Sequence, residues 1–444
     1  MLIAAAFCAT LTSCRAEFAA DPGTFAPSVG EVRTLLDQGR VRVALQQADQ
    51  LTQRYRGPEA EVVHGWALWR NGRVRDAEAR FRRAVDAGSR EAYAGLAAVR
   101  ASTGEWGAAT EMARSAGHEG ERVGAASAVL ASAAWASGNS AEAARQMQAW
   151  ATAEAGTARG RAAAAMAAAT SRLAGAPAVW QGDSVLLPLQ RLSGGGWGVR
   201  VTVAGQESVW RLDPTFRQSL LSNRLAQRLQ LFVDGPATPV ERAASARWPA
   251  LLSPRQAAIE SIGFGSLLLR NVVVGVAEVP DDAEGVVGAD VLSAARWSFD
   301  SGTGKLAIAP PSTGVLTLPG IAEGRAIAWL RARLVREGVG AQLFLYPRVS
   351  DQIVAAGLDF AATSRLDLPT FVVPPGSSTA AAPLLLGGWR GDVQWRPASL
   401  TGWAGDGGVA PTAVLGYNVL EGWAMHWYPG SMQLRIDVPP GAVQ

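Results

Sequence analysis

A glycine–alanine pattern with a nearly constant spacing most restricts what the first part of this chain can fold into. The pattern G-x-x-x-x-A occurs with its glycines 33, 32 and 34 residues apart, at Gly39/Ala44, Gly72/Ala77, Gly104/Ala109 and Gly138/Ala143. Pro is scarce from residue 29 to 175, and apolar residues three and four apart predict amphipathic helices. A glycine can end a helix in a left-handed conformation, and a small alanine lets the next helix approach closely. The pattern therefore predicts stacked helix pairs.

Repeats of this length and composition resemble tetratricopeptide repeats. The second copy, AEVVHGWALWRNGR followed by VRDAEARFRRAVDAG, fits best, with Gly65, Phe81 and Ala84 at consensus-like places. The resemblance implies an α-solenoid over residues 29–175 whose concave surface holds a peptide or a partner protein. A second interpretation stays open, in which the repeats only space or support the region that follows. His64 and His118 are expected to be surface or interhelix residues.

The chain changes texture after Ala176-Pro177. Short apolar runs with period-two alternation, such as SVLLPLQRL and VRVTVAGQESVWRLD, predict strands joined by Gly-rich hairpins. The predicted fold class is multidomain α + β, with a helical solenoid before an all-β region. We expect a signal peptide (1–14), a linker (15–28), helical repeats (29–175), a first β lobe (176–311) and a second β lobe (312–444).

Residues 210–231, WRLDPTFRQSLLSNRLAQRLQL, resemble the active-site segment of retropepsin-like aspartic proteases. In that family an apolar strand ends in Asp-Thr-Gly-Ala-Ser, and a short strand and a helix of the type SxxLAxxLGL follow. Asp213 holds the aspartate position. IGFGSLLLRNVVVGV, Val286-Val287-Gly288 and ADVLSAARWSFDSGTGKLAIAP resemble the later elements of such a lobe. The resemblance implies a retropepsin-like lobe over 176–311.

A second, degenerate copy of this lobe follows the first. Residues 285–308 align without a gap to residues 413–436 and share Gly288/Gly416 and Leu292/Leu420, among others. Upstream, AQLFLYPRVSDQIVAAGLDF is matched to the segment that carries Asp213. Two tandem lobes resemble a pepsin-like protein, which implies a bilobal all-β domain with a substrate cleft between its lobes.

Peptide hydrolysis in this family needs two carboxylates, one from each lobe, that share a proton. The alignment supplies only Asp213 and places Tyr346 at the partner position. The residues after Asp213 also depart from the Thr, Gly, Ala and Ser of the motif. Asp213 is then expected to be a residual carboxylate bonded to loop amides, with Tyr346 filling the centre. The predicted binding residues around it are Pro214, Thr215, Phe216 and Pro347.

Reactive side chains are scarce, with two Cys, three His and only Lys305 as lysine. A zinc site or an iron–sulfur cluster needs several ligands, and Schiff-base catalysis needs a positioned lysine. We therefore expect no metal and no cofactor, so any chemistry falls to carboxylates or hydroxyls. His426 is expected to be a hairpin residue. The net charge of +3 comes from Arg mixed with Asp and Glu, which favours a solvated surface over nucleic-acid binding.

Residues 2–13, LIAAAFCATLTS, are apolar, too short to span a bilayer, and suited to the hydrophobic region of a signal peptide. They end in Leu11-Thr12-Ser13-Cys14, which resembles a bacterial lipobox without the usual preceding basic residues. The resemblance implies that Cys14 is acylated and anchors a periplasm-facing envelope protein, with the outer membrane as the expected site. A plain secretory signal or an apolar terminus is the alternative.

The sequence thus predicts a lipid-anchored protein whose aspartic-protease-like domain binds a peptide or protein segment without cutting it. Such clefts hold an extended chain through main-chain bonds and side-chain pockets. Two alternatives stay open, an active aspartic endopeptidase that uses Asp213 and a scaffold in which the repeats do all the binding. The Trp residues of the second lobe are expected mostly in the core, and they include Trp389, Trp395, Trp403, Trp423 and Trp427.

Overall fold

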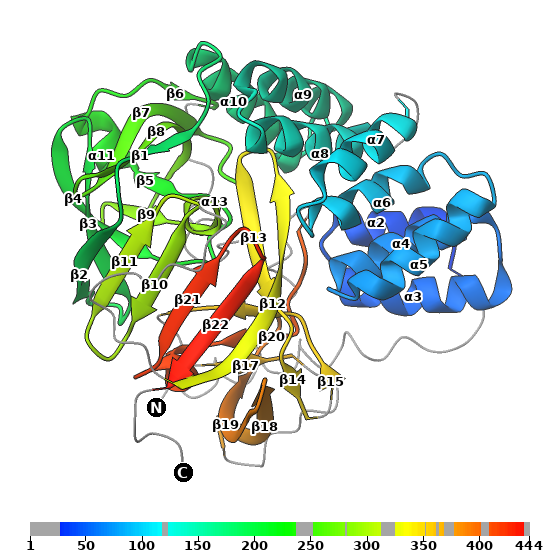
Figure 1. Cartoon of the computed structure of the whole chain (residues 1–444). Helices are drawn as coiled ribbons and strands as arrows, with labels where there is room; N and C mark the ends of the chain where they lie inside the picture. The colour runs from blue at the N-terminus through cyan, green and yellow to red at the C-terminus, as the bar shows by residue number, and fades with distance from the viewer. Residues whose placement is uncertain are drawn as a thin grey trace, which may run out of the picture.

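A computed structural model describes residues 27–117, 123–236, 252–279, 282–311, 325–350, 352–360, 364–367, 377–400 and 408–438. A helical array comes first and curves along one side of two β lobes (Figure 1). The predicted fold class, an α region followed by a bilobal all-β region, is confirmed. Cys14, His118 and Trp403 lie outside the described residues. No helix within those residues is both long and apolar enough to cross a membrane.

The helical array consists of successive helices that pack against one another. The four pattern glycines all have positive φ, between 71° and 79°, directly after a helix. The four pattern alanines are fully buried. The predicted helix stops and close helix contacts are therefore confirmed. The array comprises α2 (Val29–Asp37), α3 (Val41–Arg54), α4 (Pro58–Arg70), α5 (Val74–Asp86), α6 (Ala92–Ala101), α7 (Trp106–Ser115), α8 (Val123–Ala136), α9 (Ser140–Ala153) and α10 (Ala158–Arg172).

His64 lies between two helices of the array, as predicted. Its Nδ1 atom is 3.0 Å from the hydroxyl of Thr52, and its Nε2 atom is 2.9 Å from the carboxylate of Asp49, both on α3. Burial lowers the pKa of His64 to about 4. This histidine is therefore a neutral, hydrogen-bonded part of the helix packing at neutral pH.

The first lobe is a ring of six strands that closes on itself. The ring runs β3–β4–β9–β5–β8–β7 and back to β3. Strand β9 lies between β4, to which it is parallel, and β5, to which it is antiparallel. The short helix α11 (Asn223–Arg228) follows β5, and Ser222 caps it. The ring strands are β3 (Trp197–Val203), β4 (Gln206–Leu212), β5 (Leu220–Ser222), β7 (Gln256–Phe264), β8 (Leu267–Ala277) and β9 (Gly285–Val287), with β1 (Val179–Gln181) beside β8 and β6 (Val233–Asp234) beside β7.

The second lobe repeats this arrangement with one insertion. Strand β20 lies between β16, parallel, and β17, antiparallel, as β9 does in the first lobe. A hairpin, β14–β15, is inserted before β16, and β14 pairs with β18. The strands are β12 (Arg325–Glu337), β13 (Gly340–Leu345), β14 (Arg348–Val349), β15 (Gln352–Ile353), β16 (Ala356–Leu358), β17 (Arg365–Leu366), β18 (Ala380–Leu386), β19 (Trp389–Pro397) and β20 (Ala413–Leu415).

Tryptophans fill the core of the second lobe. Trp395 and Trp427 are fully buried. Trp389 and Trp423 pack edge to face, with 5.0 Å between ring centroids, against the same apolar core. Of the four that the structure describes, Trp395 and Trp427 are therefore core residues, and Trp389 and Trp423 are partly buried against that core.

A six-stranded antiparallel sheet joins the lobes in the order β2–β11–β10–β21–β22–β12. At its centre Ser298 pairs with His426, and the two residues are 128 positions apart, which is the offset of the gapless alignment between the lobes. An approximate two-fold axis therefore passes between them, and Ser298 Oγ is 2.7 Å from His426 Nδ1. The other strands are β2 (Val185–Arg191), β10 (Arg296–Asp300), β11 (Lys305–Ala309), β21 (Ala424–Tyr428) and β22 (Gln433–Val438).

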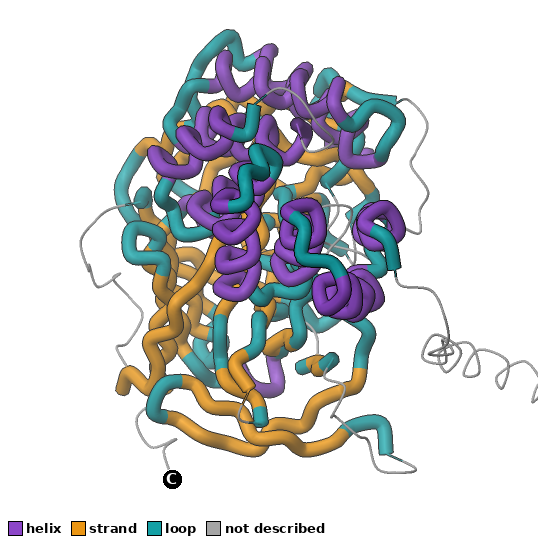
Figure 2. The backbone as a smooth tube through the Cα atoms, turned by 90° about the vertical axis from the view of Figure 1, so that its right-hand side faces the viewer, coloured by secondary structure: helices purple, strands orange, loops and turns teal. Residues whose placement is uncertain are grey.

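The β12–β13 hairpin of the second lobe reaches between the helical array and the first lobe (Figure 1). The backbone N–H of Leu334 donates to Ser102 of the array, and that of Ala341 donates to Arg217 of the first lobe. Gly338 at the tip has φ of 58° and lies against the side chains of Met147 and Met166. Figure 2 shows the helices stacked as a layer over the strands. The array thus contacts the second lobe directly.

Candidate active site

Asp213 lies at the end of β4, where this strand runs beside β9. Its backbone N–H donates to the carbonyl of Val287, 3.1 Å away, which continues the parallel pairing. Carboxylate Oδ1 accepts the backbone N–H of Thr215 at 3.1 Å and its hydroxyl at 2.5 Å. Arg211 Nε donates to Oδ2 at 2.9 Å. Asp213 is therefore a buried carboxylate held by its own loop, as predicted, and also by an arginine.

A second carboxylate, Asp359, occupies the equivalent position in the second lobe. It follows β16 where that strand runs beside β20, and its N–H donates to the carbonyl of Leu415 at 2.9 Å. Leu415 is the counterpart of Val287 at the 128-residue offset. The next loop agrees, because Ser219 Oγ accepts the N–H of Gly288 and Ser364 Oγ accepts that of Gly416. Asp213 and Asp359 are thus matched residues, which we call the acid pair.

Tyr346 does not hold the partner position, so this part of the sequence prediction is wrong. It follows β13, is partly buried, and packs against the apolar core of the helical array. Burial raises the pKa of its hydroxyl to about 12. Pro347 follows it, and its carbonyl accepts the N–H of Val354. The β14–β15 hairpin lies between these two residues and Asp359 in the sequence. Because this hairpin is an insertion, matching this segment of the second lobe to the Asp213 segment without a gap places Tyr346, and not Asp359, opposite Asp213.

The charge of Asp359 acts on the carboxylate of Asp213. The pKa of Asp213 is raised to about 6. Burial is the larger cause of this rise, and the charge of Asp359 is the second. Arg211 and the two bonds from Thr215 oppose this rise. Asp359 is itself buried and accepts Arg365 Nη2 at 2.6 Å. Each member of the acid pair is therefore bonded to an arginine of its own lobe.

The residues that follow the two aspartates are buried and differ between the lobes. Pro214 comes after Asp213, and Phe216 packs against Leu220 and Val286 of the first lobe. Phe360 comes after Asp359 and stacks on Phe299, with 4.8 Å between ring centroids. Neither Pro nor Phe carries a hydroxyl. Of the predicted binding residues, Pro214, Thr215 and Phe216 therefore lie on the Asp213 loop, whereas Pro347 lies away from it.

A buried carboxylate of the second lobe holds the Asp213 loop from behind. Glu337, at the end of β12, accepts Arg217 of that loop on Oε2 and Arg159 of the array on Oε1, the latter at 2.8 Å. Arg159 also binds Glu154. Although burial opposes it, the charges of Arg159 and Arg217 lower the pKa of Glu337 to about 2. This cluster links the array and both lobes, and sequence reasoning gave no signal for it because its members are 178 and 120 residues apart.

Within the described residues, no group of three or more His, Cys, Asp or Glu side chains is placed to hold a metal ion. No family model matches the chain, and no curated protein matches it. Among solved structures, the chain is similar to the aspartic proteinase from Irpex lacteus, at 10% identity over 58% of this chain and 98% of that one, with a TM-score of 0.36. It is also similar to basic 7S globulin from soybean, at 13% identity over 57% of this chain and 96% of that one, with a TM-score of 0.34. The strand order and register of the two lobes carry the assignment of an aspartic-protease-like fold.

Proposed function

We propose that the two β lobes bind an extended peptide or protein segment and do not cleave it. The observation that supports this most is the arginine bonded to each carboxylate, Arg211 to Asp213 and Arg365 to Asp359. Hydrolysis by an acid pair needs one ionised carboxylate and one protonated carboxylic acid. A guanidinium keeps its charge at all ordinary pH values and favours the ionised form of its partner. An arginine beside each carboxylate therefore opposes the sharing of one proton between the two.

The loops support the same proposal. Pro214 and Phe360 occupy the positions where the family resemblance expects Thr, whose hydroxyl and amide brace the two loops against each other. Phe360 instead stacks on Phe299. A two-lobed scaffold without the bracing Thr at these two positions suits binding of an extended chain by main-chain bonds and side-chain contacts.

The test is to incubate the purified chain with unfolded proteins from pH 3 to pH 8, beside Asp213→Asn and Asp359→Asn. We expect no cleavage by any of the three proteins, and binding of labelled extended peptides measured by fluorescence anisotropy. Cleavage by the native chain that is lost in both variants would overturn the proposal.

An aspartic endopeptidase is the second candidate, and the pKa of Asp213 favours it. Because Asp359 helps to raise that pKa to about 6, Asp213 can hold a proton at mildly acidic pH. On this alternative, cleavage would appear as the pH falls below about 6. The pH series above separates the two candidates.

We further propose that the array is a tetratricopeptide-like solenoid whose main role is to support the second lobe. Its inner helices already contact the β12–β13 hairpin, as the bond from Leu334 to Ser102 illustrates. A scaffold that captures partners by the array alone is the alternative. A photo-crosslinking peptide distinguishes them, since crosslinks to residues 205–220 and 355–360 support lobe binding and crosslinks confined to residues 29–172 support the scaffold.

We also propose that the chain is anchored by lipid on Cys14 and faces the periplasm. The support is the apolar stretch 2–13 and its resemblance, with Cys14, to a lipobox. Metabolic labelling with a fatty-acid analogue checks this in cells. Cys14→Ala is expected to abolish labelling and release the protein from membranes, and unchanged labelling would contradict the proposal.

A further inference from the structure

A cavity of about 470 Å³ lies where the array meets both lobes. The α6–α7 turn, the end of α8, β1, β8, α13 (Ala289–Ala294) and the β12–β13 hairpin all line it. Its walls include the partly exposed rings of Trp106, Trp135 and Trp180 and the buried side chain of Val272. Cavities of a few hundred Å³ with apolar walls and few polar groups are typical of small-molecule sites. We call it the junction cavity.

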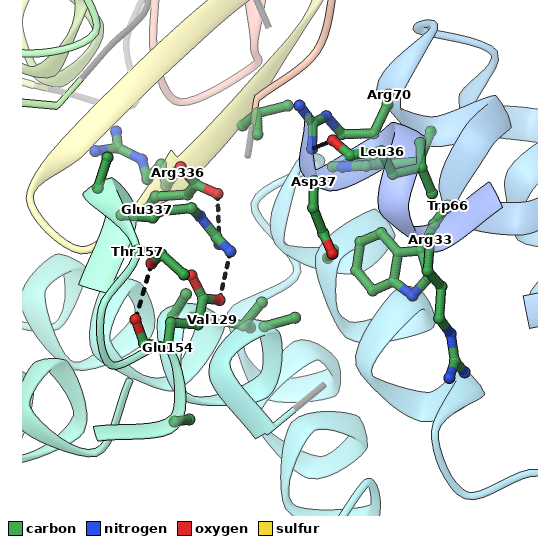
Figure 3. A pocket seen from close by; sticks show the side chains of 18 of the residues that line it. Arg33, Leu36, Asp37, Trp66, Arg70, Val129, Glu154, Thr157, Arg336 and Glu337 are labelled. Atoms are coloured by element: carbon green, nitrogen blue, oxygen red, sulfur yellow. Dashed lines mark hydrogen bonds and ion pairs between the residues drawn. The ribbon is translucent and has the colours of Figure 1, made fainter. Parts of the chain in front are cut away.

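Among the described residues that line this cavity, Arg336 is the cationic one and Asp290 the acidic one. It lies on β12 beside Glu337 (Figure 3) and lines both the junction cavity and the larger cavity, about 690 Å³, on the array side of the hairpin. Its guanidinium carries five N–H donors, and the structure gives it one hydrogen bond, from Nη2 to Ser293 Oγ at 3.3 Å. Within the described residues it has no carboxylate at ion-pair distance.

Arg336 differs in this from two arginines near the hairpin. Arg159 and Arg217 are both bonded to Glu337. Asp290 attracts Arg336, but Oδ1 of Asp290 already accepts the N–H and O–H of Ser219 and the N–H of Val291. Burial accordingly lowers the pKa of Arg336. A partly buried cation with so little compensation is unfavourable, and a bound anion would offset that cost.

We propose that the junction cavity binds a small organic acid with an apolar body, whose carboxylate pairs with Arg336 and whose body lies along Trp106, Trp135 and Trp180. The forked donors of a guanidinium match the two oxygens of a carboxylate. The apolar walls favour a hydrocarbon or aromatic body over a purely polar anion. This site is separate from the acid pair and stands whether or not the lobes cleave peptides.

Dodecanoate, below its micelle concentration, is the probe, and dodecanol is its uncharged match. Binding is measured by calorimetry and by quenching of tryptophan fluorescence on the purified full chain. We expect saturation at one equivalent of dodecanoate and at least tenfold weaker binding of dodecanol, since a charge-assisted hydrogen bond in a partly buried site contributes that much. Equal affinity for acid and alcohol, or no binding of dodecanoate, would overturn the proposal.

Arg336→Met is the key variant, and Arg331→Met, an exposed arginine of the same strand, is its control. We expect Arg336→Met to weaken dodecanoate binding at least tenfold while its stability without ligand stays equal to or above that of the native chain. Arg331→Met should leave binding unchanged. Retained affinity in Arg336→Met would sink the proposal, as would a large loss of stability without ligand. If Arg336→Met does not fold, Arg336→Lys keeps the charge but loses the fork, and its binding should still fall severalfold.

Discussion

The two lobes share one framework but hold their aspartates differently. In both lobes the aspartate follows a strand that runs parallel to a central strand, β9 in the first lobe and β20 in the second. In both, a serine hydroxyl accepts the N–H of the glycine that follows this central strand. In the first lobe that serine comes six residues after Asp213, and in the second lobe five residues after Asp359. The framework is therefore kept while the loop lengths and side chains change.

The arginines that bind the two aspartates also come from different places in the two lobes. Arg211 precedes its aspartate by two residues and lies on β4, whereas Arg365 follows its aspartate by six residues and lies on β17. Both nevertheless donate to the carboxylate. Charge compensation therefore arises independently in each lobe and is not a by-product of one shared loop conformation.

The largest effect is expected at Glu337, through which the second lobe holds the first lobe's aspartate loop. Glu337→Gln removes the charged carboxylate that Arg159 and Arg217 share, and breaking a buried pair typically costs about 3–5 kcal/mol of unfolding free energy. The folded-state pKa, about 2, is below the ordinary 4.5, so this stabilisation is present above pH 4.5 and is lost as the pH falls toward 2. Urea unfolding at pH 7 and pH 3 measures it.

The control for this prediction is Glu154→Gln, which removes only the second partner of Arg159. It should cost under about 1 kcal/mol. A loss in Glu337→Gln that is the same at pH 7 and pH 3 would show that the charge of Glu337 is not what joins the lobes.

Asp213 should show the opposite pH dependence. Its folded-state pKa is raised from 3.8 to about 6, so the fold favours the protonated carboxyl. That contribution is complete below pH 3.8 and is lost as the pH rises through 6. Asn at this position does not titrate. The stability of the native chain relative to Asp213→Asn should therefore fall by about 2–3 kcal/mol between pH 4 and pH 7 in denaturant titrations. A difference that does not change with pH would contradict the raised pKa.

The paired serines give the smallest and most direct comparison of the lobes. Ser219 Oγ accepts the N–H of Gly288 and also donates to Asp290, whereas Ser364 Oγ accepts the N–H of Gly416. Both serines are fully buried. Thermal unfolding should show that Ser219→Ala costs about 2 kcal/mol and Ser364→Ala about 1 kcal/mol. Equal losses would mean that the bond to Asp290 adds nothing in the first lobe.

The sequence predicted the fold where the signal is local or gapless. The glycine–alanine spacing located the helix pairs, and the alignment of 285–308 with 413–436 matched β9 with β20 and β10 with β21 at one offset. The sequence prediction was wrong at Asp359, because the β14–β15 hairpin and a loop that is one residue shorter shift the numbering of the second lobe relative to the first. The pattern is nevertheless present in the second lobe. An apolar residue stands before Asp359 and a serine stands before Arg365-Leu366, as at the corresponding places of the first lobe. The roles of Glu337 and Arg336 depend on long-range packing that a single sequence does not encode in any short pattern.

The central claim is that Asp213 and Asp359 form one electrostatic pair across the lobes. A ¹³C carboxyl titration by NMR, with Asp213 assigned through Asp213→Asn, tests it in the native chain and in Asp359→Asn. We predict a pKa of Asp213 near 6 in the native chain and a lower one in Asp359→Asn, because the like charge that helps to raise it is gone. The same pKa in both proteins would show that the two carboxylates do not form a pair.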